Sequence, residues 1–220
     1  MLRFPCLVLD HDDTVVASSK TIHYPAFLVT LAKLRPQHAE MPLPEFAAYC
    51  YEPGFFQLCT DIMGFNEEEM KIELQDWLDY VACHVPTAYP GMKPLLERFL
   101  AEGGKLCVVS HSHEDTIRRD YRENDLPQPE LIFGGDEPEE RRKPAPWPLE
   151  QIMAHYGFQP QQLLMVDDLK PGRDMALAAG VPFAFAGWGA LMEEIWDDMG
   201  AADYRLRTVE ELEKLLFIEE

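Results

Sequence analysis

The chain has 220 residues, enough to bury the core of one domain and to carry an insertion. Its formal net charge of −20 leaves few clustered Lys and Arg to neutralise phosphates, so we expect no binding to nucleic acid or to anionic membranes. No apolar stretch is long enough to cross a bilayer, no signal-peptide pattern opens the chain, and its five cysteines lack framework spacing, so we expect a soluble, cytoplasmic protein.

The first predicted element is a short apolar strand, Leu7-Val8-Leu9, that ends in acids at alternate positions, Asp10 and Asp12. Burying a carboxylate beside apolar residues costs several kcal/mol unless it is paired or bound to a metal. Two such acids side by side therefore favour a bound cation. One acidic strand end by itself is more often an Asx turn or a helix N-cap.

A helical insertion is predicted after this strand. The chain loses strand character until Lys105, and apolar spacing predicts a helix over Tyr24–Leu34. We therefore expect a helical cap over residues 19–84, whereas residues 1–18 and 85–220 form the remaining core.

Within the insertion, Asn66-Glu67-Glu68-Glu69 is a capping box, in which Asn66 caps a helix and Glu69 reaches back to it. The helix that follows is predicted to be amphipathic. Its apolar face is expected to consist of Met70, Leu74, Trp77, Leu78 and Val81. Three aromatic residues flank the turn at Pro53-Gly54 and are candidates for facing a substrate, although packing inside the insertion is the commoner role: Tyr51, Phe55 and Phe56.

A second strand end has different chemistry. The run from Lys105 to Val109 predicts a strand that ends in the hydroxyl of Ser110, and His111 follows directly. His111 could reach a bound phosphate through its backbone N–H or its ring. Farther along, Lys143 stands before two prolines that keep the chain extended. A single lysine in such a loop is usually solvated.

Another apolar strand, Leu163 to Val166, ends in two adjacent acids, Asp167 and Asp168. Two separate strands that each end in carboxylates are a far stronger signal than either strand alone. For both together, a shared chemical role is a better explanation than two separate turns or helix caps.

The rest of the chain alternates strand and helix, which predicts a Rossmann-like parallel sheet with helices on both faces. Strands are expected near Cys6, Leu106, Ile132, Met165 and Phe183, and helices near Leu95–Glu102, Leu149–Tyr156, Arg173–Ala179 and Thr208–Leu216. In such α/β sheets ligands bind at the carboxyl ends of the strands, where all the polar residues named above lie. In chain order they supply two acids, a hydroxyl, a lysine and two more acids, which together outline a phosphoryl-transfer site.

This order resembles the haloacid dehalogenase superfamily of phosphohydrolases, and in particular the subgroup of phosphoglycolate phosphatases and β-phosphoglucomutases. The segment from Asp10 to Ser18 is similar to the first motif of the family, Ser110 to the second and Lys143-Pro144 to the third. The stretch from Asp167 to Gly180 is similar to the variant of the fourth motif that has adjacent acids and a downstream glycine. Three positions depart from the usual residues: Asp13 replaces glycine, Ala17 replaces aspartate and His111 stands where asparagine is common.

The resemblance implies a role for each residue. Asp10 would attack phosphorus and form an aspartyl-phosphate, and Asp12 would act as the general acid and base. Mg²⁺ would be held by Asp10, the carbonyl of Asp12, Asp167 and Asp168. The residues expected to bind the phosphoryl oxygens are Ser110, His111 and Lys143.

We therefore expect a Mg²⁺-dependent phosphatase for a small phosphorylated metabolite, acting as a monomer or a small homo-oligomer, with a helical cap that closes over the site. A phosphomutase would share every core residue, and that alternative stays open. A dehalogenase would need neither Asp12 nor a metal. A receiver-type signalling module places its acid pair before the phosphorylated aspartate and lacks the insertion. A catalytically silent binding protein is disfavoured because no catalytic carboxylate is lost.

Overall fold

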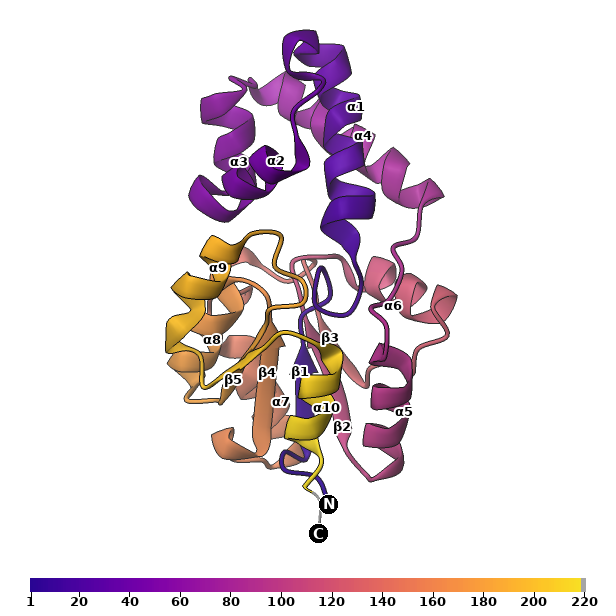
Figure 1. Ribbon diagram of the computed structural model, residues 1–220, viewed down its shortest axis with the longest axis vertical. Coiled ribbons are helices and arrows are strands. Elements are labelled where there is room, and N and C mark those ends of the chain that lie inside the picture. The colour runs from indigo at the N-terminus through magenta and orange to yellow at the C-terminus, as the bar shows by residue number, and fades with distance from the viewer. Residues whose placement is uncertain (219–220) are drawn as a thin grey trace. The chain divides into compact units, whose positions relative to one another are not determined.

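Six short strands form one parallel sheet in the computed structural model, which describes residues 1–218 (Figure 1). Their order across the sheet is β3-β2-β1-β4-β5-β6, and every neighbouring pair is parallel. The strands are β1 (Cys6–Leu9), β2 (Lys105–Val109), β3 (Leu131–Phe133), β4 (Leu163–Asp167), β5 (Phe183–Ala186) and β6 (Tyr204–Leu206). The predicted α/β fold with a parallel sheet is therefore confirmed.

The central strands are buried on both faces of the sheet. Every residue of β1 and β4 is buried, and this is why their sequences are continuous apolar runs rather than alternating ones. Cys6 and Cys107 lie inside β1 and β2 as buried free thiols, where cysteine behaves as a small apolar residue. The sequence did not predict β6, an edge strand that is too short and too polar to show a pattern.

Helices cover the sheet on both faces. One apolar cluster joins one face to α5 (Met92–Ala101), α6 (Glu114–Glu123) and α10 (Val209–Leu216). On the other face α7 (Trp147–Tyr156) packs against α8 (Lys170–Ala179), which contacts β4 and β5. Figure 1 shows α10 in front of the strands and α7 behind them. The sequence did not predict α6, because it is strongly charged and buries only Ile117, Asp120 and Tyr121.

The topology brings the two acidic strand ends together. From β1 the chain passes to β2 and β3 on one side, and it then returns to β4 on the other side of β1. This reversal creates a switch point between β1 and β4, the usual position of ligand sites in such sheets. Leu9 pairs with Val166, and the N–H of Asp10 donates to the carbonyl of Val166 at 2.9 Å. Asp10 and Asp167 therefore leave neighbouring strands at the same level.

The chain divides into two compact units. The α/β unit contains residues 1–17, 87–190 and 196–220, and the helical unit contains residues 18–86 and 191–195. The helices of the helical unit are α1 (Tyr24–Leu34), α2 (Leu43–Tyr49), α3 (Phe55–Gln57) and α4 (Glu67–Cys83), and α9 (Glu193–Asp198) crosses the boundary between the units. Within the described residues, no helix is both long and apolar enough to cross a membrane.

The helical unit has its own apolar core, built around Phe27, Leu31, Phe46 and Leu58. The predicted helix over Tyr24–Leu34 is confirmed. So is the capping box, because the Asn66 side chain accepts the N–H groups of Glu68 and Glu69 at 3.0 Å. Of the aromatic residues near the turn, Phe55 is 36% exposed and places its ring against Phe27 and Phe46, and Phe56 is 62% exposed.

The predicted apolar face of α4 is only partly buried: Val81 is buried and Met70 packs against the apolar core, as predicted. Leu74 and Leu78 are exposed, and the buried positions are Glu73, Asp76 and Val81. The reason lies in α1, where the hydroxyl of Thr30 donates to Asp76 at 3.1 Å and the ammonium of Lys33 forms an ion pair with it. Polar partners on α1 stabilise acids that periodicity alone would assign to the surface.

Candidate active site

Lys143 links the two acidic strand ends. Its Nζ donates to Asp10 Oδ1 and to Asp167 Oδ2, both at 2.7 Å, and all three side chains are buried. Burial by itself would lower the pKa of Lys143, but the two carboxylates outweigh it and hold that pKa above its ordinary value. The lysine is therefore a fixed ammonium at the centre of the site and not a solvated loop residue.

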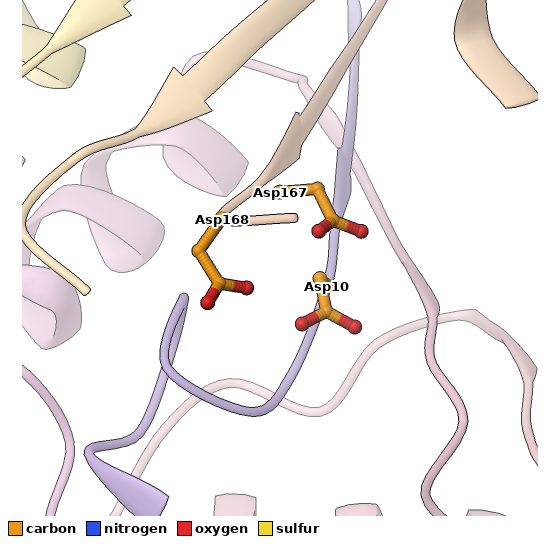
Figure 2. A group of neighbouring side chains, drawn as sticks. All are labelled: Asp10, Asp167 and Asp168. Atoms are coloured by element: carbon orange, nitrogen blue, oxygen red, sulfur yellow. The ribbon is translucent and has the colours of Figure 1, made fainter. Parts of the chain in front are cut away.

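Three carboxylates converge at this place. Asp10, Asp167 and Asp168 each place an oxygen within 4.8 Å of the others, and Figure 2 shows the three side chains entering one small space from the ends of β1 and β4. Burial raises the pKa of Asp167 to about 6, although Lys143 opposes the shift. Burial and the charge of Asp167 raise the pKa of Asp168 well above its ordinary value. A single ammonium does not balance three acids.

The donor set fits a hard divalent cation. All three ligand groups are carboxylates, they are buried, and they converge. Mg²⁺ prefers oxygen donors and usually takes few protein carboxylates together with water and substrate phosphate. A cation at this place would also relieve the repulsion that raises the pKa values of Asp167 and Asp168.

A glycine on α8 leaves room for Asp167. A Cβ at Gly172 would lie 2.1 Å from Asp167 Oδ2, so no other residue fits there without displacing the carboxylate. The N–H of Leu169 donates to Asp167 Oδ1 at 2.8 Å and orients the same group. Steric crowding by Asp167 therefore explains why the fourth motif has a glycine at position 172. Asp174, farther along α8, is exposed and pairs with Arg173, as expected for a surface residue.

Asp12 lies outside the acidic trio. Its carboxylate accepts a hydrogen bond from the hydroxyl of Ser112 at 2.6 Å, and its side chain is half-buried. Ser112 in turn donates its backbone N–H to Ser110 Oγ at 3.1 Å. Ser110 was predicted from the sequence to lie in the site, whereas Ser112 was not. Nothing in the local sequence indicates which of two serines, two positions apart in a loop, contacts Asp12.

His111 is exposed and lies beside the lysine loop. Its ring Nε2 is 3.2 Å from the backbone carbonyl of Lys143. The structure thus brings His111 next to the segment that carries Lys143. A contact between His111 and phosphate stays a prediction.

Asp13 adopts the left-handed conformation that glycine favours, with φ of 55°. Aspartate tolerates this region better than most residues, so the substitution is accommodated. Its carbonyl passes so close to Gly189 that a Cβ there would lie 1.7 Å from the oxygen. Asp13 is buried, and its charge adds to the rise in the pKa of Asp168.

Comparison with known proteins places the chain in a family. The family sequence model for haloacid dehalogenase-like hydrolases matches residues 7–186 of this chain. A phosphoglycolate phosphatase from Aquifex aeolicus is 29% identical over 186 residues, which cover 83% of this chain and 84% of that protein. Another, from Rhodospirillum rubrum, is 31% identical over 109 residues, which cover 50% of this chain and 45% of that protein.

Solved structures share the fold. A predicted phosphoglycolate phosphatase from Haemophilus somnus superposes with a TM-score of 0.73 at 19% identity, covering 98% of this chain and 99% of that chain. CbbY from Rhodobacter sphaeroides, crystallised as a D10N mutant with xylulose-1,5-bisphosphate, gives a TM-score of 0.69 at 17% identity over 96% of both chains. At these identities the structures support the fold alone. The family match over most of the chain agrees with the resemblance of the four motifs, and the chain belongs to the haloacid dehalogenase-like hydrolases.

Proposed function

We propose that the chain is a Mg²⁺-dependent phosphatase that hydrolyses a small phosphorylated metabolite through an aspartyl-phosphate on Asp10. The broader class, a phosphoric monoester hydrolase, follows from the family and from the two phosphoglycolate phosphatases to which the chain is similar. The observation that carries the proposal is the buried cluster in which Lys143 joins Asp10 and Asp167 beside Asp168.

Asp10 is the proposed nucleophile. One of its oxygens forms a bond to phosphorus while the bond from phosphorus to the leaving oxygen breaks. Water then attacks the phosphoryl group and releases inorganic phosphate and free Asp10. Lys143, at 2.7 Å, holds the nucleophile in place and counters the charge that grows on the phosphoryl oxygens.

Asp12 is the proposed general acid and base. It protonates the leaving oxygen in the first step and accepts a proton from water in the second, a contribution of roughly 10²–10⁴-fold. Its carboxylate is held by Ser112 at 2.6 Å and is not part of the acidic trio. This separation leaves Asp12 available for proton transfer while the trio binds the cation.

The residues proposed to hold Mg²⁺ are Asp10, Asp167 and Asp168, together with the carbonyl of Asp12. When bound, the cation would neutralise the carboxylates and attract the dianionic phosphate. Ser110, His111 and Lys143 are the residues proposed to bind the phosphoryl oxygens. The helical unit is proposed to act as a cap that excludes water and macromolecular substrates.

Phosphoglycolate is the first substrate to test, because both curated relatives are phosphoglycolate phosphatases. The experiment measures release of inorganic phosphate from phosphoglycolate, from phosphorylated sugars and from p-nitrophenyl phosphate, with Mg²⁺ and with EDTA. We expect turnover of at least one small ester with Mg²⁺ and none with EDTA. Transfer of phosphate between sugar positions without release would favour a phosphomutase, and full activity in EDTA would contradict the proposed metal.

A further inference from the structure

His11 stands between the two proposed catalytic acids, but its ring binds a partner elsewhere. The His11 ring contacts α6, whereas Asp10 contacts Lys143 and Asp12 contacts Ser112. The ring Nε2 of His11 lies 3.1 Å from Asp120 Oδ2 on α6, and the two side chains are 0% and 2% exposed. The backbone carbonyl of His11 also accepts the N–H groups of Val15 and Val16.

Asp120 is itself held in place. Its second oxygen, Oδ1, accepts hydrogen bonds from Arg119 Nε at 2.9 Å and from another guanidinium nitrogen of the same arginine at 2.7 Å. The ring of Tyr121 stacks near the ring of His11, with centroids 5.9 Å apart. A polar chain from Arg119 through Asp120 to His11 thus crosses an otherwise apolar layer.

Burying these hydrogen-bonded polar side chains in the core has an energetic cost. A buried polar pair loses its hydration, and an apolar pair of similar volume often serves stability equally well. The advantage of the polar chain must therefore be orientation, because a hydrogen bond fixes the orientation of its partners and an apolar contact does not. The segment before α6 supports this reading, since its Ser112 holds Asp12 from the other side.

We propose that His11 and Asp120 are positioning residues for the reaction. Their hydrogen bond fixes the backbone of Asp10-His11-Asp12, so that Asp10 stays on Lys143 and Asp12 stays on Ser112. This inference rests on the proposed function, in which both acids act on the same phosphoryl group. Neither His11 nor Asp120 touches the substrate. Their effect reaches the reaction through the spacing of the two acids.

The first test separates positioning from stability. His11→Leu leaves Asp120 Oδ2 without its histidine partner, whereas His11→Leu with Asp120→Leu removes both polar groups at once. We expect the double variant to regain most of the lost stability, yet to keep a kcat about tenfold below wild type with KM changed less than about twofold. His11→Gln should recover most of the kcat, because its amide can donate to Asp120. A double variant with wild-type kcat would overturn the proposal.

Arginines on α6 supply a matched pair of controls. Arg119 binds Asp120, whereas Arg118, the preceding residue, pairs with Glu114 on the surface of the same helix. We expect Arg119→Ala to lower kcat and Arg118→Ala to leave it unchanged. Equal kcat values in these two variants would argue against the polar chain. These variants also keep the test open if His11→Leu does not fold.

The second test needs no activity. Hydrogen exchange is measured at the backbone amides of Asp10 and Asp13, which are bonded to the carbonyls of Val166 and Val16. In the double leucine variant we expect exchange about tenfold faster at these amides, with an unfolding midpoint close to that of wild type. Unchanged exchange would overturn the positioning role whatever the activity. Faster exchange in a chain that hydrolyses no phosphate ester would instead contradict only the proposed function.

Discussion

Both units of this protein bury carboxylates, but they satisfy them in different ways. In the helical unit, Asp76 accepts a hydrogen bond from Thr30 and forms an ion pair with Lys33, both on a neighbouring helix, so its charge is balanced within the unit. Beside it, burial and the charge of Asp76 raise the pKa of Glu73 to about 7. In the α/β unit, Asp10 and Asp167 share the ammonium of Lys143, and the carboxylate of Asp168 converges on the same place.

The difference separates a structural acid pair from a ligand site. A cluster in which each acid is either paired with an internal donor or protonated requires no bound ligand. A cluster with more buried carboxylate than ammonium is balanced only by a bound cation or by raised pKa values. Buried acids therefore indicate a metal site when their oxygens converge and their internal partners are too few to balance them.

Asp10→Asn should produce the largest effect. The amide is a poor nucleophile and a neutral ligand, so we expect phosphatase activity below a few per cent of wild type, roughly the residual left when a nucleophile is lost. The measurement is phosphate release, with the unfolding midpoint as a check on folding. Asp174→Asn, on the exposed side of α8, is the control and should keep full activity. Substantial turnover by Asp10→Asn would remove Asp10 as nucleophile.

Replacing Lys143 and Lys33 compares how strongly the acid cluster of each unit depends on its lysine. Lys143→Met leaves buried Asp10 and Asp167 without their cation, and we expect it to cost about 3–5 kcal/mol of stability in the absence of metal. Lys33 is 54% exposed, so Lys33→Met should cost less than about 1 kcal/mol. Denaturant unfolding of both variants measures the difference. Similar losses would mean that the two acid clusters are equivalent, contrary to our interpretation.

Asp168→Asn should separate metal binding from folding. It removes one of few anionic ligands, so we expect the Mg²⁺ concentration for half-maximal activity to rise about tenfold or more. Without metal the same change relieves repulsion with Asp167, and the unfolding midpoint should rise slightly. Both are measured by titrating Mg²⁺ in an activity assay and in thermal unfolding. An unchanged Mg²⁺ requirement would place the cation elsewhere.

Glu73→Gln should have a modest effect on stability, and the effect should depend on pH. The pKa of Glu73 in the folded protein is about 7, above its ordinary value of 4.5. Its contribution to stability is therefore complete below pH 4.5 and is lost as the pH rises through about 7. Relative to wild type, Glu73→Gln should gain about 1–2 kcal/mol between roughly pH 5 and pH 8. Thermal unfolding at both pH values checks this, and parallel profiles would contradict the buried-acid interpretation.

Local patterns in the sequence were reliable where a few neighbouring residues decide the structure. The apolar strands that end in Asp10 and Asp167, the helix over Tyr24–Leu34 and the capping box at Asn66 are all confirmed. Each depends on side-chain period or on a hydrogen bond across three residues, which the sequence shows directly. The family resemblance rested on the same local motifs.

Tertiary structure decided the remaining features, because they join residues far apart in the chain. Ser112 meets Asp12 across 100 positions, and His11 meets Asp120 across 109, so neither pair can be recognised before the strand order is known. On α4, Asp76 is accommodated on the buried face because α1 supplies Thr30 and Lys33. By itself the sequence determined which acids end the strands. The packing of α6 and α1 determined which side chains hold those acids and which acids stay inside the protein.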